Sequence, residues 1–151
     1  MSGSGTADSV VTEPNGKPFV WQLRVYWEDT DGGGVVYHSQ YLNFFERARS
    51  EWLRARGVNQ SQLAEQDKVV FAIGHMSVDW RRPARLDDLL DISVFAVEAG
   101  ASRLTFRQEM HRAADRQLLA TARVVAACLD ADSFKPRKMP DWIRTEINHV
   151  K

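Results

Sequence analysis

The hydrophobic repeat of the chain changes between Arg24 and Arg56, and this change restricts the fold more than any other feature of the sequence. From Trp21 to Trp27, apolar residues alternate with polar ones, which predicts a half-buried β-strand. The glycines Gly32–Gly34 that follow cannot sustain either regular element, so they predict a loop. From Ser39 on, helical spacing predicts one amphipathic helix, whose apolar face consists of Tyr41, Phe44, Phe45, Ala48, Trp52 and Leu53.

Both ends of this helix carry favourable capping residues. Ser39 is a favoured N-cap residue, and Gly57 is a favoured C′ residue because it has no Cβ to oppose a left-handed backbone. The apolar face between them is wide and aromatic. We therefore expect the helix to lie deeply against a sheet.

Beyond the helix, the chain has the pattern of β-structure. A short helical turn is predicted at 61–65, and strands are predicted at 68–81 (with a bulge at Gly74), 90–96, 104–110 and 117–129. Hairpins between neighbouring strands would give an antiparallel α+β sheet with the helix on one face. The apolar segment Val124–Cys128 indicates a central strand or a subunit interface. One helix cannot cover so wide a sheet, so we expect the chain to self-associate.

The length and composition are those of an ordinary single domain. The chain has 151 residues with 20 basic and 20 acidic side chains, so its overall charge does not favour nucleic acid. The single cysteine, Cys128, excludes an intrachain disulfide and is interpreted as a core residue. Residues 1–18 are predicted to be a disordered arm and residues 19–151 the folded domain. The arm has no signal-peptide or membrane-span pattern, so we expect a cytoplasmic protein without membrane insertion.

Two carboxylates, Asp29 and Asp31, lie between the predicted strand and the predicted helix. A carboxylate beside a helix N-terminus can activate water, and free backbone N–H groups there can stabilise the charge that develops on a carbonyl oxygen. An enzyme is therefore the leading interpretation. Asp29 is one alternation step from Asp31, and hydrogen bonding in the turn or at an interface is favoured over a chemical role for it. No acids or histidines at suitable spacing accompany the pair, so no metal site is expected.

Three segments together resemble a known family. They are EDTDGGGVVYHSQYLNFFERAR (28–49), RRPARLDDLL (81–90) and SFKPRKMP (133–140). The first resembles the motif of the hotdog-fold acyl-CoA thioesterases of the 4-hydroxybenzoyl-CoA thioesterase superfamily. The resemblance is greatest to the YbgC-type branch, which is associated with the Tol–Pal envelope system. It extends from about Val20 to the C-terminus, so residues 19–151 would form one hotdog thioesterase domain.

This resemblance implies a fold and an assembly. A long central helix would be wrapped by an antiparallel sheet. Two copies would join their sheets edge to edge with active sites at the dimer interface, and two dimers commonly form a tetramer. The substrate would be an acyl-CoA thioester, hydrolysed to a free acid and coenzyme A. Coenzyme A is then part of the substrate, and no separate cofactor is implied.

The resemblance also implies roles for two residues. Asp31 would be the catalytic carboxylate, acting as a nucleophile or as a base that activates water, with water activation preferred. The backbone N–H of His38 would stabilise the oxyanion. The His38 imidazole would either orient substrate or water, or only cap the loop.

Further residues are candidates for substrate binding. Gly34 would allow close approach of the substrate or simply form the turn, and Tyr41 would line an acyl tunnel or belong to the core. Glu46 matches a family position that faces the active site, although it also fits a solvated charge. The phosphates of coenzyme A need basic partners, and the candidates are Arg81, Arg82, Lys135, Arg137 and Lys138.

Two other functions compete with thioester hydrolysis. The protein could be a binding module for acyl carrier protein or for envelope-lipid enzymes, with weak residual hydrolysis. It could also act as a hydratase or dehydratase on acyl thioesters, but the motifs of those hotdog relatives are not found in this sequence.

Overall fold

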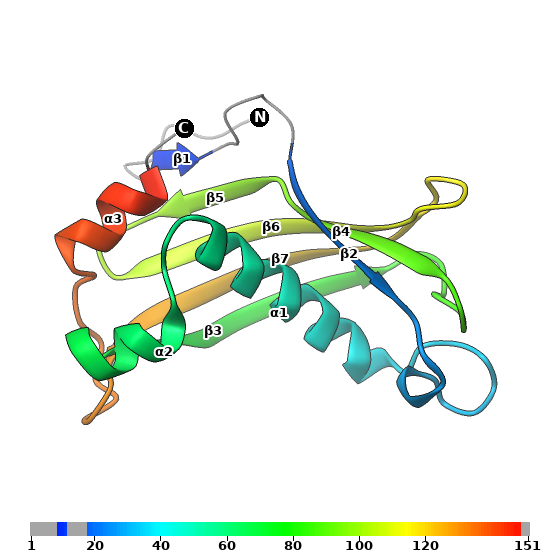
Figure 1. Cartoon of the computed structure of the whole chain (residues 1–151), viewed down its shortest axis with the longest axis horizontal. Coiled ribbons are helices and arrows are strands. Elements are labelled where there is room, and N and C mark those ends of the chain that lie inside the picture. The colour runs from blue at the N-terminus through cyan, green and yellow to red at the C-terminus, as the bar shows by residue number, and fades with distance from the viewer. Residues whose placement is uncertain (1–8, 12–17, 149–151) are drawn as a thin grey trace.

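The computed structural model describes residues 9–11 and 18–148, which form a curved antiparallel sheet with one long helix across its inner face (Figure 1). The strands are β1 (Ser9–Val11), β2 (Phe19–Arg24), β3 (Val69–Trp80), β4 (Leu89–Val94), β5 (Ala96–Ala99), β6 (Arg103–Arg112) and β7 (Leu118–Asp130). The helices are α1 (His38–Ala55), α2 (Gln60–Gln62) and α3 (Asp141–Asn148), with a 3₁₀ turn η1 (Trp27–Asp29) and a π-helical turn η2 (Leu63–Asp67). The predicted α+β hotdog class is confirmed.

The order of the strands differs from the hairpin prediction at one place. β7 pairs with β6 on one side and β3 on the other, while β6 also pairs with β4 and β5. β3 and β4 are therefore separated by two strands, so the prediction of a hairpin between them is wrong. The segment that connects β3 to β4 is instead bound to the chain just before α1, because Val36 N–H donates to Ala84 O (2.8 Å). The inner position of β7 confirms the central-strand interpretation of Val124–Cys128.

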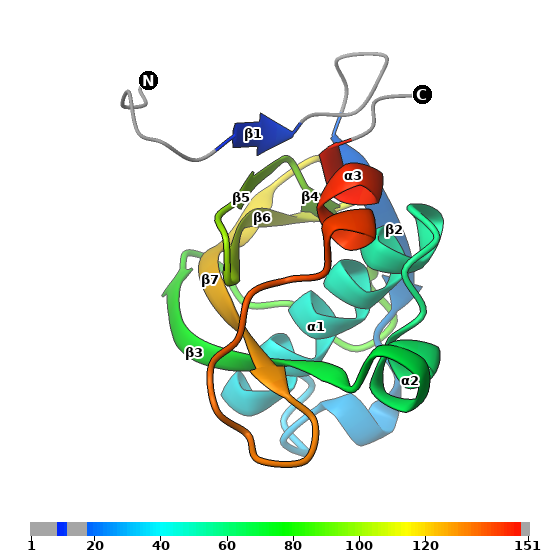
Figure 2. The same cartoon turned by 90° about the vertical axis from the view of Figure 1, so that its left-hand side faces the viewer.

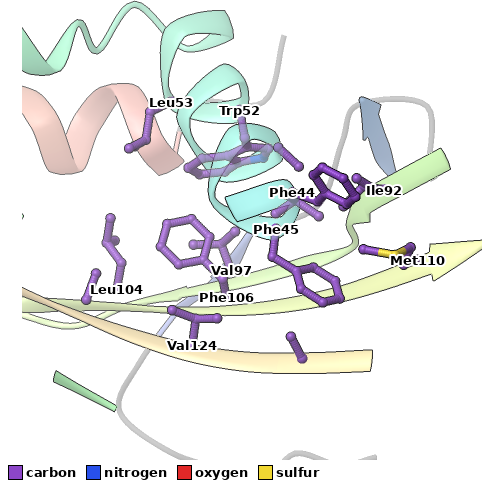
Figure 3. Close-up of a cluster of buried hydrophobic side chains, with 14 of the residues drawn as sticks. Phe44, Phe45, Trp52, Leu53, Ile92, Val97, Leu104, Phe106, Met110 and Val124 are labelled. Atoms are coloured by element: carbon purple, nitrogen blue, oxygen red, sulfur yellow. The ribbon is translucent and has the colours of Figure 1, made fainter. Parts of the chain in front are cut away.

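The helix α1 packs its predicted apolar face against the sheet. Figure 2 shows α1 obliquely, with the sheet curving around it. Trp52 meets Phe106 edge to face at a centroid distance of 5.8 Å, and Phe44 and Phe45 are fully buried. The sheet contributes the side chains of Ile92, Leu104, Phe106, Met110 and Val124 to this core (Figure 3). Because each large buried side chain contributes about 1.5–3 kcal/mol, this contact stabilises the position of the helix strongly.

The prediction for the C-terminal end of α1 is confirmed, and the prediction for its N-terminal end is wrong. Gly57 has a φ of 81°, and the N–H groups of Gly57 and Val58 donate to Arg54 O and Leu53 O, which is a Schellman motif. The prediction of Ser39 as N-cap is wrong, because the helix begins at His38 with Tyr37 as its N-cap. The start is earlier because Tyr37 N–H donates to Asp29 O (3.1 Å), which orients the chain into the helix before Ser39.

The first strand is shorter than its alternation predicted. β2 ends at Arg24, and Trp27 begins the turn η1 with 64% of its side chain exposed. A local hydrogen bond interrupts the alternation there, because Tyr26 N–H donates to the side chain of Asp29 three residues later (2.8 Å). The predicted bulge at Gly74 is confirmed by a register shift between Ile73 and His75, and Cys128 is buried as predicted.

Part of the predicted disordered arm forms regular structure. Within residues 1–18, Ser9–Val11 forms β1 and pairs with β5. Residues 1–8 and 12–17 lie outside the described residues, as do residues 149–151.

The left-handed backbone at Gly57 predicts a specific stability difference. Gly57→Ala should lower the free energy of unfolding by about 1 kcal/mol, because an L-residue is strained at positive φ. Gly57→Asn should lower it less, since Asn tolerates this conformation. Urea denaturation of the three proteins measures both values. Equal values for Ala and Asn would contradict the assignment.

Candidate active site

The Asp31 carboxylate lies on an exposed loop directly before α1. Thr30 and Val36 form an isolated bridge, and Asp31 N–H donates to Val35 O (3.0 Å), so the loop closes on itself. Gly33 N–H donates to Asp31 Oδ1 (2.7 Å). Within the part of the chain that the structure describes, Asp31 Oδ2 has no hydrogen-bond partner, so it can accept a proton from a bound water.

The glycines of this loop serve its shape. Gly32 and Gly34 have φ values of 89° and 87°, which L-residues adopt only with strain. Leu86 N–H donates to Gly34 O (2.9 Å), which attaches the loop to the segment after β3. This hydrogen bond supports the interpretation of Gly34 as a residue that forms the turn.

Asp29 has a structural role, as its position in the alternation predicted. It is only 6% exposed. Its Oδ2 accepts from Tyr26 N–H (2.8 Å), and its Oδ1 accepts from the Gln40 side chain (2.9 Å). The carboxylate thus joins η1 to the first turn of α1 and fixes the base of the loop that carries Asp31.

A hollow beside the start of α1 brings together four of the predicted site residues. It is lined by Val35, Val36, His38, Tyr41, Trp80, Arg81, Arg82 and Pro83, and we call it the N-terminal hollow. The His38 ring lies 5.1 Å from the ring of Trp80 between centroids. Since His38 is the first residue of the helix, its backbone N–H has no acceptor within the helix and can bind an oxyanion.

Tyr41 belongs mainly to the core. It is 2% exposed, and its hydroxyl accepts from Ala84 N–H (2.9 Å). Burial raises the pKa of this hydroxyl, so it stays neutral at physiological pH. Its ring meets Trp80 edge to face at 6.1 Å and forms one wall of the N-terminal hollow.

A second cavity lies further along α1, between the helix and the edge strand β3. We call it the α1–β3 pocket, and it is lined by Glu46, Arg49, Ser50, Leu53, Gln60, Phe71, Ile73, Leu104, Phe106 and Ala126. Glu46 is exposed at this pocket and does not reach the N-terminal hollow. Sequence reasoning did not identify Arg49, which is 6% exposed. Its spacing was the available signal, since it lies four residues after Phe45 and three before Trp52 on the buried face.

The remaining basic candidates lie at the opposite end of β3. Arg137 N–H donates to Cys128 O (3.0 Å), and its guanidinium donates to Asp67 O (3.3 Å), just before β3 begins. Arg81 and Arg82 directly follow the other end of the same 12-residue strand. The two ends of such a strand are separated by about 35–40 Å. Within one chain, Lys135, Arg137 and Lys138 are therefore not brought together with Arg81 and Arg82.

The described residues contain neither a cluster of metal ligands nor a helix that could span a membrane. In residues 9–11 and 18–148, no group of three or more His, Cys, Asp or Glu side chains is placed to hold a metal ion. Over the same ranges, none of the helices combines the length and apolar character needed to cross a bilayer.

Comparison with known proteins agrees with the geometry. Residues 25–147 match the model of the thioesterase-like superfamily. The chain belongs to this superfamily. It is 38% identical over 133 residues to the acyl-CoA thioesterase YbgC of Haemophilus influenzae, with 88% of this chain and 96% of that protein covered. It is 42% identical to the acyl-CoA thioester hydrolase YbgC of Escherichia coli O6:H1, with 85% and 95% covered. The resemblance stated from the sequence motifs is confirmed.

Solved structures support the same family and fold. The 1,4-dihydroxy-2-naphthoyl-CoA thioesterase Slr0204 from Synechocystis has a TM-score of 0.79 at 29% identity, with 87% of this chain and 96% of that chain covered. A probable thioesterase from Bartonella henselae has a TM-score of 0.75 at 39% identity, with 82% and 100% covered.

The different environments of the two loop acids predict different effects on stability. Asp29→Asn should lower the free energy of unfolding by about 1–3 kcal/mol, because one of its two buried acceptor oxygens becomes an N–H donor. Asp31→Asn should change it by less than about 0.5 kcal/mol, since Asp31 is exposed. Thermal or urea unfolding of both variants tests this. A large loss for Asp31→Asn would mean that Asp31 holds the loop rather than serving the reaction.

Proposed function

We propose that this protein hydrolyses acyl-CoA thioesters to a free acid and coenzyme A, with Asp31 as the essential carboxylate. The observation that carries the proposal is the position of Asp31, exposed on a closed loop immediately before the free N-terminus of α1. Relatives at 38–42% identity are named acyl-CoA thioesterase or thioester hydrolase, which supports the substrate class. No comparison supports the binding-module alternative.

The reaction follows from the groups at this loop. The Asp31 carboxylate takes a proton from a water molecule, and the oxygen of that water attacks the thioester carbonyl carbon. The carbonyl oxygen becomes negatively charged and is stabilised by the His38 N–H and the positive end of the α1 dipole. The C–S bond then breaks, and the coenzyme A thiolate leaves with the bonding electron pair and takes up the proton held by Asp31, which regenerates the Asp31 carboxylate. The carboxylic acid formed loses its proton to the medium.

The open edge of β3 supports a homodimer. Among the described strands, β3 pairs only with β7, so its other edge presents a long row of free backbone groups. Ile73 and Trp80 on this strand are 50% and 44% exposed. Antiparallel pairing of two β3 strands would fill both edges and cover these side chains. We propose this dimer, and a dimer of such dimers as the complete assembly.

The same pairing would complete a binding site for coenzyme A. It would place the start of the partner's β3, with the partner's Lys135, Arg137 and Lys138, beside Arg81 and Arg82 of this chain. Basic groups that are distant within one chain would then face the same nucleotide phosphates. A complete site would need both copies.

A cytoplasmic location fits this substrate and the unpaired cysteine, Cys128, and we propose it. An acyl carrier protein remains the alternative source of the acyl thioester. Hydrolysis of acyl-carrier-protein thioesters at rates above those of the matching acyl-CoA would favour it.

Asp31→Asn should lower kcat by about 100- to 10,000-fold on the preferred acyl-CoA, because the base that activates water is lost. Thiol release from a panel of short-chain, long-chain and aromatic acyl-CoAs measures this under conditions where both proteins are folded. An Asp31→Asn rate equal to that of the wild type would overturn the assignment.

A single turnover in heavy-oxygen water separates the two roles of Asp31. Water activation should place the label only in the released acid. Label in the Asp31 side chain would instead show direct attack through an anhydride.

Replacing Arg81 and Arg82, or Lys135 and Arg137, with glutamine should raise KM for acyl-CoA by about tenfold or more, because charge-assisted contacts to phosphate are lost. KM for the matching acyl-pantetheine, which has no nucleotide, should not change. Equal effects on both substrates would show that these residues do not bind the nucleotide.

A further inference from the structure

The α1–β3 pocket combines apolar walls with polar side chains, which include Glu46, Ser50 and Gln60 as well as Arg49. It encloses about 80 Å³ and opens to solvent. Its apolar walls come from Phe71, Phe106 and Leu104, together with neighbouring aliphatic residues. A buried cation, the guanidinium of Arg49, lies among these walls. A simple hydrocarbon pocket would not need this charge.

Arg49 is held in place by a neutral partner. Its Nη1 donates to Gln108 Oε1 (3.0 Å), and Gln108 Nε2 donates to Phe45 O (3.0 Å). Gln108 is fully buried, so this chain of hydrogen bonds fixes the guanidinium between helix and sheet. Burial lowers the pKa of Arg49 to about 10, so the group remains charged at neutral pH.

The charge of Arg49 is not matched by a contacting anion within the described residues. No carboxylate there lies within 4 Å of its guanidinium nitrogens, and Glu46, one turn earlier, acts on it only through space. A buried charge without an ionic partner is costly, and a neutral side chain could satisfy Gln108 equally well. The arrangement suits a ligand that brings its own anion, because a guanidinium can bind a carboxylate through two parallel hydrogen bonds.

We propose that the α1–β3 pocket binds an acyl group that ends in a second carboxylate, so that the substrate is the mono-CoA thioester of a dicarboxylic acid. Arg49 binds the distal carboxylate, and the apolar walls hold the methylene groups between the two ends. Hydrolysis releases the free dicarboxylate and coenzyme A. The inference rests on the proposed thioesterase function.

The proposed dimer brings this pocket to the reacting groups. Antiparallel pairing would place the Trp80 end of the partner's β3 beside the Phe71 end of β3 in this chain. The partner's His38 would lie close to that junction. Phe71 and Ile73 line the α1–β3 pocket. A thioester held at the partner's loop can therefore extend its acyl chain toward Arg49.

Matched substrates and variants test the proposal. We would compare the mono-CoA thioesters of glutarate, adipate and suberate with analogues that carry an isopropyl group in place of the distal carboxylate. The variants are Arg49→Gln and Arg49→Lys, and Arg47→Gln is the control because Arg47 is an exposed residue of the same helix. Thermal unfolding of each variant accompanies the kinetics.

The proposal predicts a selective loss. For the best dicarboxylic substrate, Arg49→Gln should lower kcat/KM by about 10- to 100-fold, mainly through KM, and Arg49→Lys should lower it less. Turnover of the isopropyl analogues by Arg49→Gln should stay within about threefold of wild type, and Arg47→Gln should match wild type throughout. If Arg49→Gln does not fold, two measurements still test the role of Arg49. They are the kinetics of Arg49→Lys and the preference of the wild type between the matched substrates.

The failures of the two proposals differ. An equal loss on both substrate series, or a wild-type preference for the isopropyl analogues, overturns the role of Arg49 while the thioesterase function stands. Absence of turnover on every acyl-CoA, including the wider panel used for Asp31, overturns the proposed function itself.

Discussion

The contact between the aromatic face of α1 and the inner face of the sheet determines where every other part of this protein lies. Phe44, Phe45 and Trp52 are buried against β4, β6 and β7, so the helix cannot slide or rotate without exposing them (Figure 3). With the helix fixed, its free N-terminus stays at one end of the sheet. The buried Asp29 carboxylate then holds the loop that presents Asp31 there.

The same contact leaves one side of the helix and one edge of the sheet incomplete. The edge strand β3 has unpaired backbone groups, and both cavities lie between it and α1. The N-terminal hollow lies at the Trp80 end and the α1–β3 pocket at the Phe71 end. In the proposed antiparallel dimer, opposite ends of two strands meet. The hollow of one copy would then adjoin the pocket of the other, which explains why a single chain carries the parts of a site at separate places.

Local patterns predicted the parts of the structure that depend on neighbouring residues. The helical repeat identified the buried face of α1, and Gly57 identified its C-terminal end, because both follow from short-range geometry. Contacts between distant residues decided the rest. The hydrogen bond from Val36 to Ala84 directs the chain after β3 away from a hairpin, and the one from Tyr37 to Asp29 starts α1 before Ser39. The helical repeat also places Arg49 on the buried face, but its hydrogen-bond partner, Gln108, lies 59 residues away and could not be identified from local spacing.

We propose that each catalytic site is built from two chains, and mixing two different variant chains in one dimer shows whether it is. One chain carries Asp31→Asn and so lacks the catalytic carboxylate. The other chain carries glutamine at Lys135, Arg137 and Lys138 and so lacks the proposed contacts to the nucleotide. In a mixed dimer, one site would carry both changes and the other would carry neither. At acyl-CoA concentrations well below KM, where both variants are impaired, coexpression of the two chains should therefore restore about a quarter of wild-type thioesterase activity. Activity no higher than that of the separate variants would show that each chain carries a complete site.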